Sequence, residues 1–188
     1  MSSSESIGGY FVERYGDFVH VGYRVVVNGN VVVMDVGVFL GVDEDLALEV
    51  CKILTPYLPS LVSEFVSNGV ITGFKELEIY DIEDARMLII RRFRSLGLYG
   101  KGEVDIAGWM FAGLGIGDCE LVASDITCRI NRFGVEIEVR FARGYIEITE
   151  RDRARRLRRK PVAKLLVAGA TAPEIVNALK RLLEIEDN

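Results

Sequence analysis

The chain has 188 residues, 49% of them hydrophobic, and a net charge of −5 at pH 7. This length suits one domain or two small ones and can bury roughly 70% of the unfolded surface, which argues against intrinsic disorder outside the ends. The start, MSSSESIGGY, is no secretory signal, and the longest uncharged apolar-rich run, 106–117, is too short for a membrane span of about 20 residues. We therefore expect a cytoplasmic protein without a membrane partner.

Positive charge is concentrated in the segment 151–164. It holds eight basic residues and one acidic residue, a net charge of +7, which leaves −12 on the rest of the chain. Segregation on this scale creates a local positive field that the net charge hides. The basic residues are Arg151, Arg153, Arg155, Arg156, Arg158, Arg159, Lys160 and Lys164.

The remaining composition gives fewer clues. Glutamine is absent and arginine outnumbers lysine 17 to 6, which we interpret as a thermophile-like composition. Cys51, Cys119 and Cys128 form no CxxC pair, and the chain has one histidine, so we expect no structural metal and no cofactor. We interpret the cysteines as small buried hydrophobes, and their disulfide state stays open.

Two valine-rich runs around Asn28-Gly29 predict a β-hairpin. In the expected register Val27 pairs with Asn30 and Val25 with Val32. One face then carries only apolar side chains and is predicted to face the core. The other face is mixed and contains Gly22 and Gly37, so either a close neighbour or a partner covers it. The candidate interface residues on this mixed face are Val26, Val31, Val33 and Phe39.

Helical patterns follow the hairpin. Asp43 is the expected cap of a helix with apolar residues at three and four spacing, which Pro56 and Pro59 should kink or split and Asn68-Gly69 should stop. The segment KELEIY, 75–80, alternates like a strand. Asp81 then caps an expected helix that runs to about Leu96.

The glycine-rich segment 97–117 is expected to contain a short helix that Gly113 closes, followed by the strand CELVA. GLGIGD does not fit a nucleotide loop, because a helix precedes it and a strand follows, the reverse of the dinucleotide fingerprint. FAGLGIGDCELV resembles the helix-to-strand passage of vinyl-reductase-type ligand-binding domains over twelve residues. The cysteines that such domains carry near their end have no counterpart after Cys128.

A three-strand meander is predicted with turns at Phe133-Gly134 and Arg143-Gly144. The register places apolar residues opposite each other on one side: Ile130 with Ile137, Cys128 with Val139, Val139 with Ile148, and Phe141 with Ile146. On the other side it pairs opposite charges: Arg129 with Glu138, Arg140 with Glu147, and Glu136 with Arg151.

The basic run is expected to be helical over 150–160, with a second helix at 162–168 after Pro161 and a third opened by the capping box Thr171 to Glu174. The last two helices would form an αα-hairpin packed on the sheet. Their order also resembles the first two helices of some helix-turn-helix domains. However, no third helix follows, and acidic residues close the chain.

No catalytic residue is assigned. We expect Asp35 to lie diagonal to His20, but no recognised nucleophile motif accompanies this pair. Asp43, Glu44 and Asp45 fit a helix start, while Glu136, Glu138 and Glu147 already have expected arginine partners.

These patterns predict an α+β fold: the N-terminal hairpin, one central strand and the meander in a mostly antiparallel sheet, packed with helices and ending in an αα-hairpin. We expect one domain over 1–188, with 10–97 and 98–188 as alternative sub-lobes. The leading hypothesis is a non-enzymatic binding or assembly module whose segment 151–164 contacts nucleic acid or an acidic partner. The alternatives are a homo-oligomeric structural protein that uses the hairpin face, and a small-molecule binder or enzyme with a pocket near Trp109 and the glycines.

Overall fold

The computed structural model describes residues 9–27, 30–67, 102–132, 134–142, 144–151 and 159–185. Side chains are described for all of these except 25–27, 30–35, 61, 64–67, 132, 151 and 159–162. The strand predicted at 75–80 and the helix predicted at 81–96 lie outside the described residues. None of the described helices is long and apolar enough to cross a lipid bilayer.

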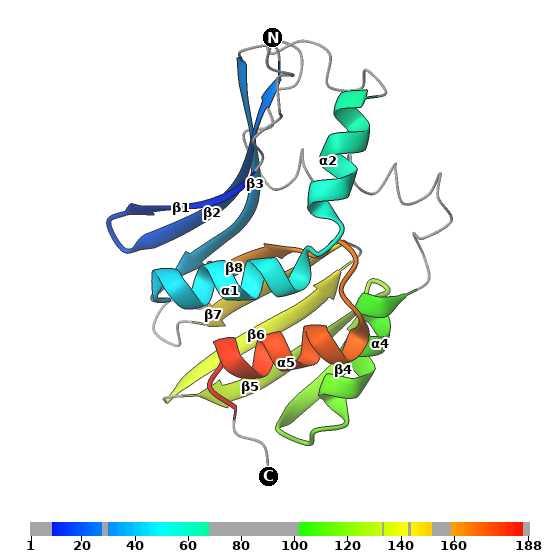
Figure 1. Ribbon diagram of the computed structural model, residues 1–188. Coiled ribbons are helices and arrows are strands. Elements are labelled where there is room, and N and C mark those ends of the chain that lie inside the picture. Colours follow the sequence, from blue (N-terminus) through cyan, green and yellow to red (C-terminus); the bar gives the residue numbers. More distant parts are fainter. Residues whose placement is uncertain are drawn as a thin grey trace, which may run out of the picture.

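Eight strands form one antiparallel sheet in the order β1-β2-β3-β8-β7-β6-β5-β4 (Figure 1). The strands are β1 (Gly9–Tyr15), β2 (Phe18–Val27), β3 (Asn30–Leu40), β4 (Gly117–Val122), β5 (Asp125–Arg132), β6 (Val135–Ala142), β7 (Tyr145–Arg151) and β8 (Arg159–Leu166). The described helices are α1 (Glu44–Leu54), α2 (Leu58–Ser67), α4 (Glu103–Ala112) and α5 (Ala172–Leu182). The predicted α+β class is confirmed, and β3 and β8 join strands from both halves of the chain.

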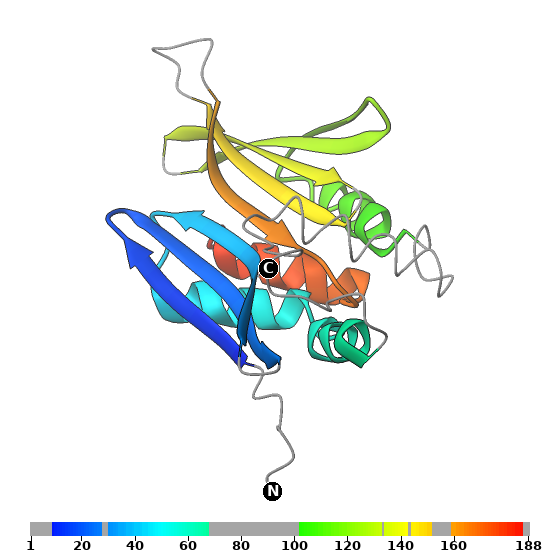
Figure 2. The same cartoon turned by 90° about the horizontal axis from the view of Figure 1, so that it is seen from above.

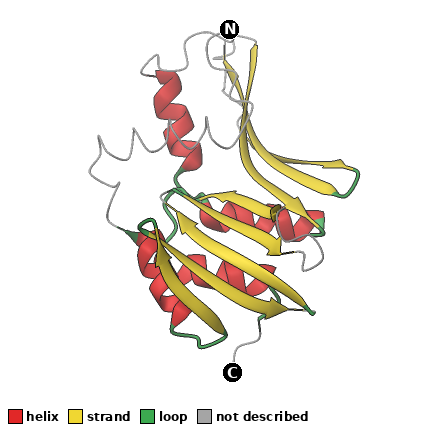
Figure 3. Ribbon diagram, turned by 180° about the vertical axis from the view of Figure 1, so that it is seen from behind, coloured by secondary structure: helices red, strands yellow, loops and turns green. Residues whose placement is uncertain are grey.

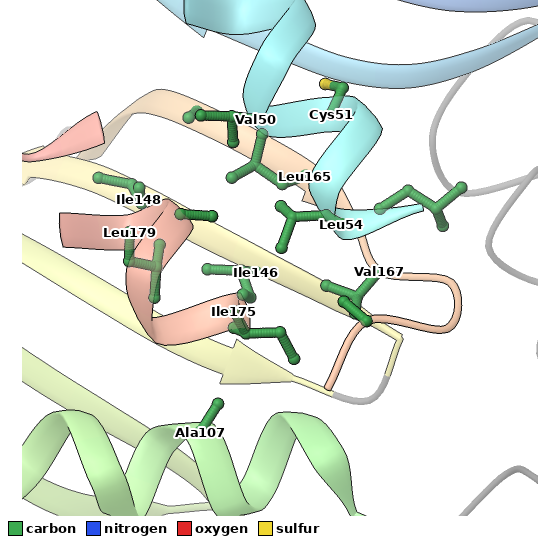
Figure 4. Close-up of a cluster of buried hydrophobic side chains, with 14 of the residues drawn as sticks. Val50, Cys51, Leu54, Ala107, Ile146, Ile148, Leu165, Val167, Ile175 and Leu179 are labelled. Carbon is green, nitrogen blue, oxygen red and sulfur yellow. The ribbon is translucent and has the colours of Figure 1, made fainter. Parts of the chain in front are cut away.

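Helices α1, α5 and α4 cover one face of the sheet, and α5 lies between the other two (Figures 1 and 2). Seen from behind, the opposite face of the sheet lies in front of these helices (Figure 3). The core fills the space between the two layers. Val50 and Leu54 of α1, Ile175 and Leu179 of α5, and Leu165 of β8 are all fully buried there (Figure 4).

The N-terminal hairpin begins in the predicted register, with Val27 opposite Asn30 and Val25 opposite Val32. A bulge then shifts the pairing, so Val21 lies opposite Gly37 and Val36 is the extra residue. The shift turns Phe39 into the core, where it is 0% exposed. The prediction of Phe39 as an interface residue is therefore wrong. The side chains of Val26, Val31 and Val33, the other candidate interface residues, lie outside the described residues.

Helix starts and stops largely follow the sequence signals. Asp43 caps α1 by accepting hydrogen bonds from the backbone N–H groups of Asp45 and Leu46. Helix α2 starts at Leu58, so the segment with Pro56 splits the helical pattern as predicted. Helix α1 packs closely over Gly37, because a Cβ atom there would lie 2.6 Å from Cys51 Sγ. A close neighbour, rather than a partner, explains this glycine.

The meander has the predicted register throughout. Ile130 pairs with Ile137, Val139 with both Cys128 and Ile148, and Phe141 with Ile146, on the helix-facing side. The charged pairs Arg129–Glu138, Arg140–Glu147 and Glu136–Arg151 occupy the other side. Gly134 and Gly144 have φ angles of 77° and 82°, the left-handed conformation that such tight turns require.

The end of the chain differs from the prediction. Residues 159–166 form strand β8, which pairs with β7 and β3, so they are not part of the helices expected at 150–160 and 162–168. The predicted αα-hairpin is therefore wrong, and α5 alone follows the sheet. Pro161 lies beside a shift in the β7–β8 register and outside the β3–β8 pairing, where a strand tolerates a missing N–H group.

Candidate nucleic-acid interface

The basic segment 151–164 spans the connection between two adjacent antiparallel strands. Strand β7 ends at Arg151 and β8 begins at Arg159, and these two residues pair directly. Glu150 pairs with Lys160, and Arg151 is also opposite Glu136 of β6. The backbone register thus brings Arg151 and Arg159 together at one end of the sheet. Arg153, Arg155, Arg156 and Arg158 fall between them in the sequence and lie outside the described residues.

Lys164 is the one basic residue of this segment whose side chain is described. It pairs with Glu147 on β7 and with Val38 on β3, on the face of the sheet away from the helices. Its ammonium nitrogen lies 5.2 Å from the centre of the Tyr145 ring, a cation–π distance. Lys164 is half-buried in the middle of the sheet, five residues along the strand from Arg159.

Acidic side chains on the same face of the sheet have arginine partners within the meander. Arg129 lies 3.5 Å from Glu120 and 3.7 Å from Glu138. Arg140 lies 3.7 Å from Glu147 and 3.9 Å from Asp125, and it also donates a hydrogen bond to the Tyr145 hydroxyl. These carboxylates therefore already have cations beside them that do not belong to the basic run.

A hollow of about 300 Å³ lies over β4, β5 and β6. Its lining includes Asp118, Glu120 and Glu136 together with Arg129 and Asn131. Strand β5 ends and β6 begins at the same end of the sheet as the basic run, and Glu136 links the two regions through its pairing with Arg151. Trp109, where a pocket was expected, does not line this hollow.

One of the three cysteines is buried in the core, and the other two form a disulfide. Cys51 is buried under β3, and this burial raises the pKa of its thiol, so it is a packed core residue. Cys119 and Cys128 form a disulfide between paired positions of β4 and β5, with their Cα atoms 4.0 Å apart. The sequence left the disulfide state of the three cysteines open, so neither this pairing nor its place at the sheet edge was predicted.

His20 is in an aromatic cluster. Its ring lies 5.7 Å from the Phe11 ring in an edge-to-face arrangement, and Arg24 lies 5.2 Å from the centre of Phe11. The bulge moves the partner of His20 from Gly37 to Val38, whereas Asp35 keeps its expected pairing with Gly22. The Asp35 side chain lies outside the described residues, so its contact with His20 stays a prediction. Within the described part of the chain, no cluster of three or more histidine, cysteine or acidic residues could hold a metal ion.

Comparisons of the chain with protein-family models, with curated proteins and with solved structures found no match.

Proposed function

We propose that this protein is a non-enzymatic nucleic-acid-binding module that holds phosphate groups with the arginine-rich segment 151–164. The observation that carries the proposal is the direct pairing of Arg151 with Arg159. Like charges opposite each other in a sheet are unfavourable, and four more arginines lie between them in sequence. An anionic partner removes that repulsion, and guanidinium groups bind phosphate oxygens with charge-assisted hydrogen bonds.

Glu136 opposite Arg151 and Glu150 opposite Lys160 offset part of the positive charge, and an external partner would balance the rest. Glu120, Glu138 and Glu147 on the exposed face of the meander are within 4 Å of Arg129 or Arg140. A nucleic acid is favoured over an acidic protein because regularly spaced phosphates match a dense run of arginines, and release of condensed counterions drives the binding. The negative charge on the rest of the chain would confine such a ligand to the basic run.

The test is fluorescence anisotropy of labelled single- and double-stranded RNA and DNA at several salt concentrations. We expect affinity to fall steeply with salt, because each phosphate contact releases counterions. Replacing Arg155, Arg156, Arg158 and Arg159 with glutamine should weaken binding at least about tenfold and reduce the salt slope by about four.

A matched control removes four cationic charges elsewhere: Arg14, Arg24, Lys180 and Arg181 to glutamine. Arg14 and Arg181 pair with Glu44 and Glu49, far in sequence from the basic run. The control should bind nearly as well as the natural chain. Equal losses in both variants, or no binding at low salt, would contradict the proposal. Equally tight binding of polyglutamate would indicate an acidic protein partner instead.

A further inference from the structure

Helix α4 is apolar on two faces. Its inner face, with Ala107, Gly108 and Phe111, is buried against the sheet and α5. Its outer face carries Ile106, Trp109 and Met110, whose exposed fractions are 47%, 59% and 40%. Glu103 and Asp105, both in the first turn, are the only charged residues of α4. A helix that is apolar all round is normally buried, so the outer face of α4 is typical of a surface that meets a partner.

This outer face continues onto the segment that follows α4 in the chain. Leu114 and Ile116 are 37% and 38% exposed, and Leu121 of β4 is 60% exposed. Leu121 pairs with the buried Ile126, which also lies beneath Gly108 of α4, so the Leu121 side chain is on the helix side of the sheet. We call this set the edge patch: Ile106, Trp109, Met110, Leu114, Ile116 and Leu121.

The edge patch is large enough for a stable dimer. With ~200 Å² for each large apolar residue, exposed fractions of 37–60% amount to on the order of 600 Å². The largest apolar patch of a monomer is typically about 300–600 Å². A standard interface buries about 800 Å² per partner, of which roughly 65% is apolar in homodimers. The edge patch supplies that apolar share.

Strand β4 is one end of the eight-stranded sheet, and α4 lies beside it at the periphery of the molecule (Figure 2). Among the described strands, only β5 pairs with β4, and a strand edge without a partner pairs readily with another chain. Asp118 and Glu120 point to the face opposite α4, and Glu120 lies 3.5 Å from Arg129. The side of the edge that meets α4 is thus free of these charges.

We propose that a second copy of this chain docks on the edge patch, so that α4 and β4 of the two copies face each other across a twofold axis. A twofold interface brings the same patch together from both subunits, and apolar surfaces complement each other without directional matching. An antiparallel arrangement of the two α4 helices places Glu103 and Asp105 of each copy at opposite ends, which avoids repulsion between like charges. The inference is independent of nucleic-acid binding.

Trp109 reports on this interface, because it is the single tryptophan of the chain. We would measure mass by sedimentation equilibrium together with Trp109 emission and acrylamide quenching, from nanomolar to high micromolar protein. The proposal expects a monomer-to-dimer transition, with a blue shift of the emission and a loss of quenching over the same concentration range. A non-reducing gel excludes dimers linked through cysteines.

Variants assign the transition to the edge patch. Met110→Lys and Leu121→Lys each place a charge in the interface and should raise the dimer dissociation constant at least about tenfold. The matched control is Tyr15→Lys, since Tyr15 is 62% exposed on β1 at the other edge of the sheet. Unchanged dimerisation in both patch variants would overturn the proposal. A monomer at every concentration would also overturn it; a shielded Trp109 in that monomer would mean that the chain covers the patch itself.

Discussion

Helices α4 and α5 pack against each other but expose opposite kinds of surface. Helix α5 buries Ile175, Val176 and Leu179 and exposes Glu174, Asn177 and Arg181, so its two faces match the core and the solvent. Helix α4 buries a narrow inner face of small residues and Phe111, and exposes Trp109 and two aliphatic side chains. The difference is that α5 presents polar side chains to the solvent, whereas α4 exposes apolar side chains, on which the proposed dimer depends.

The two helices are also joined at their ends. The Glu103 carboxylate of α4 accepts a hydrogen bond of 2.7 Å from the backbone N–H of Ala172, the first residue of α5. The capping box between Thr171 and Glu174 satisfies further N–H groups there. Because the inner face of α4 and the start of α5 are fixed together, changes on these surfaces should affect folding, while changes on the edge patch should affect association.

The largest effect is expected from the buried face of α5. Ile175→Ala removes a fully buried side chain and should lower the free energy of unfolding by about 2–5 kcal/mol, through lost burial and a new cavity. Urea denaturation measures this loss. Asn177→Ala on the exposed face of α5 is the control and should change stability by less than ~0.5 kcal/mol. Similar losses in both variants would contradict the assigned faces.

A smaller effect is expected from the inner face of α4. Gly108→Leu adds a side chain where a Cβ atom alone would lie 2.8 Å from Ile126 Cδ1 and 3.2 Å from Phe141 Cγ. The crowding should destabilise the fold by about 1–3 kcal/mol even though leucine favours helices. Met110→Leu, on the outer face of α4, is the control and should leave the stability of the monomer nearly unchanged. A more stable Gly108→Leu variant in thermal denaturation would show that α4 is not seated on β5 and β6.

The smallest effect is expected at the cap of α5. Thr171→Ala removes the hydroxyl that pairs with Glu174 and should cost about 1 kcal/mol. Hydrogen bonds from the Thr171 hydroxyl and backbone N–H lower the pKa of Glu174 in the folded state. Its stabilising contribution is therefore present above the unfolded pKa of roughly 4.3 and is lost as the pH falls through the lower folded value.

Urea midpoints measured from pH 7 to pH 3 test this pH dependence. Glu174→Gln keeps a hydrogen-bonding side chain at the cap but cannot ionise, so it should remove part of the decline in stability on acidification. An unchanged acid decline in Glu174→Gln would assign the pH dependence to other carboxylates.

The sequence predicted elements best where two independent patterns agreed. In the meander, the apolar pairs of one face and the charge pairs of the other required the same register, and the structure has it. In the N-terminal hairpin, the Asn28-Gly29 turn fixed the register near the turn, and only valine alternation supported it farther along the strands. A run of similar β-branched residues tolerates one inserted residue, so the bulge at Val36 and the burial of Phe39 could not be predicted.

Strand β8 was predicted as helix for a physical reason. Leu165 and Leu166 at the end of β8 are buried in the middle of the sheet, and Val167 and Ala168, which follow the strand, are buried as well. A continuous apolar run has no alternation and cannot be distinguished from a buried helix by periodicity. The edge patch was missed for a related reason: Ile106, Met110 and Leu114 have the spacing of a core face, and only the packing of α4 shows that the core is on its other side.

The disulfide between Cys119 and Cys128 has a consequence for the β4 edge of the sheet. It covalently ties β4 to β5 in a fixed register, within a hairpin whose turn residues Ala123 and Ser124 have φ angles of 50° and 74°. An edge strand held in this way has little conformational freedom left to lose when it meets another molecule. Oxidation of these two cysteines thus preorganises the β4 edge for binding. In a reducing environment, binding of another molecule at this edge would carry a larger entropic cost.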